Sequence, residues 1–201
     1  MIPAVHGLPV LQPACAPRER ADAARNRRRI LEAAAGLVGE RGIEHVSMDD
    51  VARAARVGTG TLYRRFGDRA GLALALLDEH TRTFQDALIL GPPPLGPGAP
   101  ASERMHAFGD GYLDLLERYA DLLVVADVAP LRSGPWQVYA THLTILLQEA
   151  APHLDAEFTA LALLATLGPG HHVHARRDLG WSLDRLRDGW HALVDALACA
   201  R

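Results

Sequence analysis

The chain has 201 residues, 49% of them hydrophobic and 22% charged, which excludes a disordered tail or a fibre and allows one or two globular domains of about 100–200 residues each. No apolar run reaches the roughly 18–20 residues of a membrane helix, the first residues lack the pattern of a secretory signal, and Cys15 and Cys199 are too few for a disulfide framework, so we expect a cytoplasmic protein without a membrane partner. The net charge of −3 conceals an asymmetry, because residues 1–70 hold 12 Arg against 8 acidic residues and residues 71–201 hold 9 against 16.

The N-terminal part predicts a flexible arm followed by an amphipathic helix. Residues 1–20 are rich in proline and small residues and show no periodicity, which is typical of a mobile terminus. From Asp22 the apolar residues recur at helical spacing, and Gly42 is predicted to end the helix as its C-cap. The apolar stripe of this first helix is Ile30, Ala34, Leu37 and Val38.

Two short helices are predicted next, joined by a glycine-containing turn. Ser47, with the carboxylate of Asp50 three residues on, is typical of a helix start that runs to about residue 55. Leu62 and Phe66 lie one helical turn apart and predict a second short helix, after which Asp68 is expected to cap a long helix. Two short helices behind an amphipathic one are the pattern of a helix-turn-helix unit.

The remainder of the chain also reads as helical. Residues 91–100, with five prolines and three glycines, predict a stiff linker without helix. Beyond it the apolar spacing predicts helices over 102–119, 121–127, 135–150, 155–167 and from Ser182 to the end, with a break at 168–170. No convincing strand pattern is present. The predicted fold class is therefore all-α, with a helix-turn-helix domain at 21–67 and a helical bundle for ligand binding and dimerisation at 68–201.

The second short helix carries the groups that a recognition helix needs. Such a helix lies in the major groove of DNA while the first helix crosses the backbone. Arg64 and Arg65 stand on it, and a guanidinium suits both phosphate and guanine. Thr59, Gly60 and Thr61 stand at its N-terminus, where free N–H groups favour a phosphate.

The stretch from Arg28 to Leu77, above all SMDDVARAARVGTGTLYRRFGDRAGLALALL, resembles the DNA-binding domain of TetR/AcrR-type transcriptional repressors. The resemblance implies a bacterial homodimer that binds a palindromic double-stranded DNA operator and is released by a small-molecule effector in its C-terminal domain. Carried over by position, groove contacts fall on Thr59, Gly60, Thr61 and Arg64. Phosphate contacts fall on Ser47, Met48 through its backbone, Tyr63, Arg65 and Arg69.

Two positions depart from the family pattern in the turn between the short helices. Arg56 stands where the family usually has glycine, so it must adopt a left-handed backbone or let the turn shift, at a cost of about 1 kcal/mol. Gly58 stands where serine is usual, which removes a capping hydroxyl. These departures keep open the alternative of a helical partner-binding or small-molecule-binding protein whose helix-turn-helix is degenerate.

Aromatic residues in the C-terminal part are candidates for a ligand pocket and for a dimer interface. Ligand sites in helical bundles are apolar with few polar groups, and aromatic anchors concentrate at interfaces. Either set could equally be core. The candidate pocket residues are Phe108, Tyr112, Trp136, Tyr139 and His142, and the candidate interface residues are Trp181, Trp190, Leu193 and Leu197.

The histidines at 171, 172 and 174 suggest a further alternative. Imidazole binds zinc, nickel or copper, so His171, His172 and His174 could make a metal-responsive regulator, although no carboxylate or cysteine stands at ligand spacing. The sequence contains no nucleophile elbow, phosphate loop or other catalytic signature. We therefore expect neither catalytic residues nor a cofactor.

Overall fold

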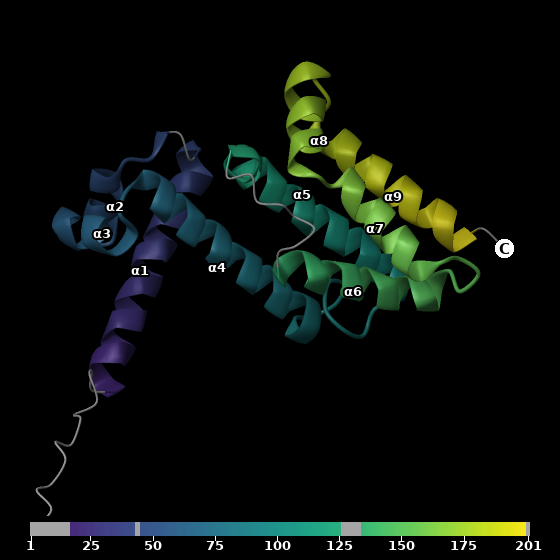
Figure 1. Cartoon of the computed structure of the whole chain (residues 1–201), viewed down its shortest axis with the longest axis horizontal. Helices are drawn as coiled ribbons and strands as arrows, with labels where there is room; N and C mark the ends of the chain where they lie inside the picture. The colour runs from purple at the N-terminus through teal and green to yellow at the C-terminus, as the bar shows by residue number, and fades with distance from the viewer. Residues whose placement is uncertain (1–16, 43–44, 126–133, 200–201) are drawn as a thin grey trace, which may run out of the picture.

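The structure is a computed structural model that describes residues 17–42, 45–125 and 134–199 (Figure 1). Within these ranges every regular element is a helix, which confirms the predicted all-α class. None of the described helices has both the length and the apolar character needed to cross a membrane. The helices are α1 Pro17–Arg41, α2 Met48–Ala54, α3 Thr59–Phe66, α4 Arg69–Leu90, α5 Ala101–Val125, α6 Gly134–Ala150, α7 Ala156–Thr166, α8 Pro169–Val173 and α9 Leu183–Cys199, with a π-helix, η3, at His174–Asp178.

The buried side chains form two clusters. The first, called the N-terminal core, joins α1, α2, α3 and the start of α4, and it also takes Leu115 and Tyr119 from α5. The second, called the C-terminal core, joins the end of α4 with α5, α6, α7 and α9. Helix α4 contributes Leu76 to the first cluster and Phe84 to the second, so it belongs to both and crosses between them (Figure 1).

The predicted helix starts are confirmed by their capping hydrogen bonds. The Ser47 hydroxyl accepts from the Asp50 N–H at 3.1 Å, and the Asp50 carboxylate accepts in return from the Ser47 N–H. Asp68 accepts from the Gly71 N–H at 2.8 Å at the start of α4. These bonds satisfy N–H groups that have no partner inside a helix, and so they fix where α2 and α4 begin.

Three predicted boundaries in the chain are wrong. Residues 17–20 of the predicted arm belong to α1, and the rest of the arm lies outside the described residues. The predicted break between residues 119 and 121 is absent, because α5 runs without interruption to Val125; residues 126–127 lie outside the described part. The predicted break at 168–170 is too long, because Pro169 and Gly170 already belong to α8, which continues into η3.

The segment 91–100 contains no helix, as predicted, but it is a packed turn between α4 and α5 within one domain. The Gly96 N–H donates to the Pro92 carbonyl at 3.0 Å, and Leu95 packs against the C-terminal core. A Cβ at Gly96 would lie 1.9 Å from the Gly91 carbonyl oxygen, so only glycine permits this closure. The segment therefore fixes the angle between α4 and α5.

Candidate DNA interface and ligand cavity

Helix α3 has one buried side and one open side. Leu62 is completely buried in the N-terminal core, whereas Tyr63 is 50% exposed and Arg64 and Arg65 are exposed. The aliphatic anchor thus holds the helix while the next three side chains point away from the core. Figure 1 shows α2 and α3 at the end of the molecule remote from α9.

The turn between α2 and α3 is kept despite the two departures in sequence. Arg56 adopts φ +52°, the left-handed backbone that a non-glycine residue rarely takes. Gly58 is the N-cap of α3 and makes no side-chain capping bond there. The geometry of a helix-turn-helix is therefore achieved at the cost of backbone strain at Arg56.

The predicted contacts at the start of α2 differ in what their side chains do. The hydroxyl of Ser47 is engaged with Asp50 within the capping box, at 2.6 Å as donor and 3.1 Å as acceptor. The side chain of Met48 is buried in the N-terminal core, so it can offer only its backbone to a phosphate, as the family position implies. Hydrogen bonding to Ser47 lowers the pKa of the Asp50 carboxyl, with Arg53 and Arg41 adding to the effect, which keeps this cap ionised.

Arg65 has a structural partner that the sequence does not reveal. Its guanidinium donates to the Ala23 carbonyl of α1 at 2.8 Å, across 42 residues of sequence. At the other end of α3, the Thr59 hydroxyl donates to the Asp49 carboxylate of α2 at 3.2 Å. Both ends of α3 are thereby tied to neighbouring helices. No periodicity links these positions, so no local sequence signal could have found the pairs.

The remaining predicted DNA contacts lie at the two ends of α3. Gly60 is exposed and Thr61 is half-buried in the first turn of α3, and Arg69 is exposed at the first residue of α4. Thr61, Arg64 and Arg65 also line a groove between α3 and the N-terminal half of α1. The structure thus places the predicted residues on the same small domain.

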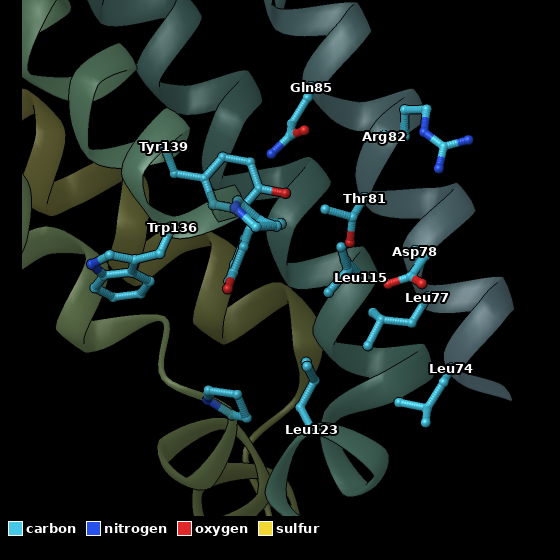
Figure 2. A pocket seen from close by; sticks show the side chains of 13 residues that line it. Leu74, Leu77, Asp78, Thr81, Arg82, Gln85, Leu115, Leu123, Trp136 and Tyr139 are labelled. Carbon is cyan, nitrogen blue, oxygen red and sulfur yellow. The ribbon is translucent and has the colours of Figure 1, made fainter. Parts of the chain in front are cut away.

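A cavity of about 400 Å³ lies between α4, α5, α6 and the start of α8 (Figure 2). Its aromatic lining includes Tyr112, Trp136 and Tyr139, three of the five predicted pocket residues. The other two are elsewhere: Phe108 is fully buried in the C-terminal core, and His142 lines a separate outer groove. Polar side chains from α4 complete the cavity: Asp78, Thr81, Arg82 and Gln85.

Burial governs the ionisation of the groups in and near the cavity. It raises the pKa of the Tyr112 hydroxyl to about 12, and it raises the pKa of Tyr139 further, with Tyr112 adding to that rise and Thr81 opposing it. Burial also lowers the pKa of His142 to about 4, with the charge of Arg104 contributing. At neutral pH all three side chains are uncharged.

The cavity touches both cores of the molecule. Leu77 of α4 and Leu115 of α5 line it and are also members of the N-terminal core. At its mouth, Arg82 donates to the Glu79 carboxylate at 3.2 Å, and the same oxygen accepts from Arg27 of α1 at 3.5 Å. A molecule in the cavity would therefore contact side chains on which the packing of the N-terminal core depends.

The predicted interface residues divide between the interior and the surface. Trp190 is 2% exposed and donates its indole N–H to the Met105 carbonyl at 2.8 Å. Its ring packs directly on Gly109, where a Cβ would lie only 2.1 Å from the ring nitrogen. It belongs to the core of this chain, because α9 must dock closely on α5, and not to a surface. Leu193 is 46% exposed, Leu197 packs partly on the C-terminal core, and Trp181 lies under the Arg185 guanidinium at 4.1 Å.

The three histidines do not converge. His172 is buried with its Nε2 3.0 Å from the Glu117 carboxylate, and His174 Nδ1 lies 2.7 Å from Asp178, whereas His171 is exposed. Among the described residues no group of three His, Cys, Asp or Glu side chains is arranged to hold a metal ion. The metal-responsive alternative therefore has no site in the described part of the chain.

Comparison with known proteins agrees with this architecture. The family model for bacterial regulatory proteins of the tetR family matches residues 30–76. An HTH-type transcriptional regulator of Staphylococcus aureus (strain bovine RF122 / ET3-1) is 42% identical over 65 residues, which are 32% of this chain and 35% of that protein. The alignment thus spans about a third of the length of the curated relatives that the chain matches.

Solved structures resemble most of the chain. A TetR transcriptional regulator of Streptomyces coelicolor is 28% identical with a TM-score of 0.56, over 85% of this chain and 97% of that one. The transcriptional regulator FadR of Bacillus subtilis, solved in complex with stearoyl-CoA, is 19% identical with a TM-score of 0.52, over 83% of this chain and 96% of that one. The match at residues 30–76 and the likeness of the whole helical fold lead to one conclusion: the chain carries a DNA-binding domain of the tetR family on a fold like that of solved TetR transcriptional regulators.

Proposed function

We propose that this protein is a ligand-responsive transcriptional repressor that binds a palindromic operator as a homodimer and is released by a small molecule in the cavity. One observation carries the proposal: α4 belongs to both cores and forms a wall of the cavity. The protein would act in the cytoplasm on double-stranded DNA. It requires no catalytic residue and no cofactor for this activity.

The DNA-binding part of the proposal rests on the open side of α3. Tyr63 and Arg64 are exposed beside the fully buried Leu62, so they can reach a groove while the helix stays anchored. Arg69 at the start of α4 would hold the adjacent phosphates, and the excess of Arg over acidic residues in the first 70 residues favours DNA. The acidic remainder of the chain would be repelled by DNA, which leaves the N-terminal domain as the productive contact.

Release by a ligand would act as a population shift through α4. A ligand moves an equilibrium only by its difference in affinity for the two states, and a hundredfold loss of operator affinity requires about 2.7 kcal/mol of coupling. A ligand in the cavity contacts Leu77 and Leu115, which the N-terminal core also uses. Repacking these two residues would tilt the helix-turn-helix relative to the C-terminal core.

The dimer part of the proposal rests on unpaired apolar surface at α7 and α9. Phe158 and Leu161 on α7 are 71% and 46% exposed, and Leu193 on α9 is 46% exposed beside the exposed small residues Gly189 and Ala192. Such a face suits helix packing between two copies, with the two α3 helices presented to half-sites about 34 Å apart. Leu197 and Trp181 would lie at the margin of this face.

The experiment that tests the proposal is a selection of genome fragments with the purified protein at about 150 mM salt, followed by footprinting of the enriched DNA. Recovery of a palindromic site would support a dimeric operator-binding regulator. If a folded dimer enriches no sequence, the proposal is wrong and the strained turn at Arg56 becomes the reason to examine. A Leu193→Asp variant of the full chain, changed at a residue that is 46% exposed on α9, should be monomeric by light scattering and should bind the recovered site poorly.

A further inference from the structure

We infer that the cavity selects a compact, uncharged, amphipathic molecule whose single hydrogen-bonding group meets the hydroxyl of Tyr139 at the buried end. This inference rests on the proposed function and specifies the chemical class of its effector. It follows from three features of the cavity: a buried hydroxyl without a normal hydrogen bond, charged lining residues that are exposed, and a stripe of polar residues on α4 together with apolar residues from α5 and α8.

The inner end of the cavity is aromatic and encloses one unsatisfied polar atom. Tyr139 is 3% exposed, Trp136 6% and Tyr112 7%, so their rings form the closed end. The buried Tyr139 hydroxyl makes no hydrogen bond of normal length among the described residues, although Thr81 of α4 lies near enough to lower its pKa. A buried hydroxyl without a partner destabilises the site, and a ligand that supplies the partner recovers that loss.

The polar residues of the cavity are arranged in a stripe along one helix. Asp78, Thr81, Arg82 and Gln85 follow one another at the spacing of adjacent helical turns on α4. Figure 2 shows the Tyr139 hydroxyl directed towards Thr81 and Gln85 across the cavity. The lining from α5 and α8 includes the apolar residues Leu115, Leu123 and Pro169. The occupant must therefore present an apolar body to α5 and a polar edge to α4 and Tyr139.

The charges in the lining lie only at the mouth. Asp78 and Arg82 are exposed, and the Arg82 guanidinium is already paired with Glu79. Among the described residues that line the cavity, the charged ones are Asp78 and Arg82, and neither is buried with the three aromatic rings. A charge moved there from water would have no counter-ion, which is costly in an apolar site. The group that meets Tyr139 is therefore neutral, such as a hydroxyl, carbonyl or amide oxygen.

The test compares three probes of one shape by equilibrium dialysis against the full chain. The probes are 2-naphthol, 2-methylnaphthalene and 2-naphthoate, which place a hydroxyl, a methyl or a carboxylate on the same two-ring body. We expect 2-naphthol to bind about tenfold more tightly than 2-methylnaphthalene, since one hydrogen bond contributes about 1.4 kcal/mol. We expect 2-naphthoate to bind more weakly than 2-naphthol by a similar or larger factor.

The variant that isolates the hydroxyl is Tyr139→Phe, which keeps the ring. It should bind 2-naphthol and 2-methylnaphthalene with equal affinity. Tyr119→Phe removes a phenol hydroxyl from the N-terminal core, outside the cavity, and should preserve the tenfold preference. A preference that survives in Tyr139→Phe, or tighter binding of 2-naphthoate than of 2-naphthol, would overturn the inference.

The outcomes separate this inference from the proposed function. If the probes bind without discrimination, the cavity is a ligand site but the assignment of Tyr139 is wrong. If none of the three binds, the inference fails, whereas operator binding by the same preparation, measured without probe, would leave the DNA-binding part of the proposed function intact. If the probes discriminate as expected but no operator is found, the inference stands and the DNA-binding proposal fails.

Discussion

The two cores of this protein are built from different side chains. The N-terminal core is mainly aliphatic, with Ile30, Val51 and Leu62 among its fully buried members; its aromatic rings include Tyr119, supplied by α5, and the partly buried Phe66. The C-terminal core is dominated by rings, among them those of Phe84, Phe108, Tyr112, Trp136, Tyr139 and Trp190.

This difference matches the tasks proposed for the two regions. Small aliphatic side chains pack short helices tightly and fix the direction of α3. Large rings meet edge to face, as Tyr112 and Tyr139 do with centroids 5.4 Å apart, and here they enclose an opening lined by hydroxyls. The family model matches only residues 30–76, whereas the ring-rich region is recognised by its fold. A tightly packed helix-turn-helix domain is thus joined to a C-terminal core whose packing leaves space for a ligand.

The largest expected effect comes from breaking the aliphatic core. Leu62→Ala should lower the free energy of unfolding of the N-terminal domain by about 2–5 kcal/mol, because Leu62 is completely buried. Urea unfolding followed by circular dichroism measures this loss. The neighbouring Tyr63→Ala should change stability by no more than about 0.5 kcal/mol, since half of that side chain is exposed, while weakening operator binding. Equal losses of stability in the two variants would contradict the description of α3 as a helix with one buried side and one exposed side.

The next effect concerns which parts of the DNA the exposed arginines of α3 and α4 contact. Arg64→Ala should weaken binding to the preferred operator by about 1–3 kcal/mol and relax base preference, as expected for a base-edge contact. Arg69→Ala should weaken all sequences alike and lower the salt slope by about one unit. Fluorescence anisotropy titrations on operator and scrambled DNA at several salt concentrations measure both. Uniform loss on every sequence from both changes would refute this division.

Next to the C-terminal core, His142 makes the free energy of unfolding depend on pH. Its pKa is about 4 in the folded chain because of burial, against an ordinary value of 6.5, so the unfolded chain takes up the proton first and stability falls as pH drops from 6.5 to 4. His142→Leu should remove this dependence, worth about 1–2 kcal/mol after allowance for the partly exposed ring. Unfolding midpoints at pH 7.5 and pH 4.5 measure it. If the variant loses as much stability as the wild type between pH 7.5 and pH 4.5, burial does not hinder the protonation of His142 and the prediction is wrong.

The strained turn of the N-terminal region predicts a stabilising change. Arg56→Gly should raise the free energy of unfolding by about 0.5–1 kcal/mol, because Arg56 adopts φ +52° and glycine accepts that backbone without steric cost. Ala54→Gly, two residues earlier in α2, should instead lower it by about 1 kcal/mol. Chemical denaturation of both variants measures the contrast. Destabilisation by both would mean that the left-handed residue is not strained.

The smallest expected effect lies at the junction of the two regions. Glu79→Gln should cost about 0.2–1 kcal/mol, since the carboxylate pairs with Arg27 and Arg82 at half-exposed positions. The loss should disappear at about 1 M salt, where the Debye length is about 3 Å. Asp86→Asn, a second carboxylate of α4, serves as the matched control. A loss that persists in high salt would point to packing rather than charge.

Much of the local structure could be predicted from the sequence because its causes are local. The caps of Ser47 and Asp68 depend on residues within three positions, and the apolar spacing of Ile30 and Leu62 reports which side of each helix is buried. The resemblance to the TetR family rested on these same residues and is confirmed. At Arg56 the sequence left two alternatives, a left-handed backbone or a shifted turn, and the structure has the left-handed backbone.

The sequence misplaced the groups whose role depends on distant partners. Trp190 looked like a surface anchor, yet Gly109, 81 residues earlier, makes the space that buries it. The stripe from Asp78 to Gln85 resembled any solvated helix face, and only the approach of α6 turns it into the wall of a cavity. Phe108 and His142 shared the aromatic character of the true lining but point elsewhere.

The sequence alone therefore determined most of the helices, the caps at Ser47 and Asp68, the helix-turn-helix and the resemblance to the TetR family, because hydrogen bonding and apolar periodicity act over a few residues. The tertiary structure decided which rings enclose a cavity, which tryptophan is core, and that α4 joins the two regions. These outcomes depend on contacts between residues far apart in the chain, such as Arg65 with Ala23 and Trp190 with Met105. Packing of this kind is set by shape in three dimensions, which no local pattern encodes.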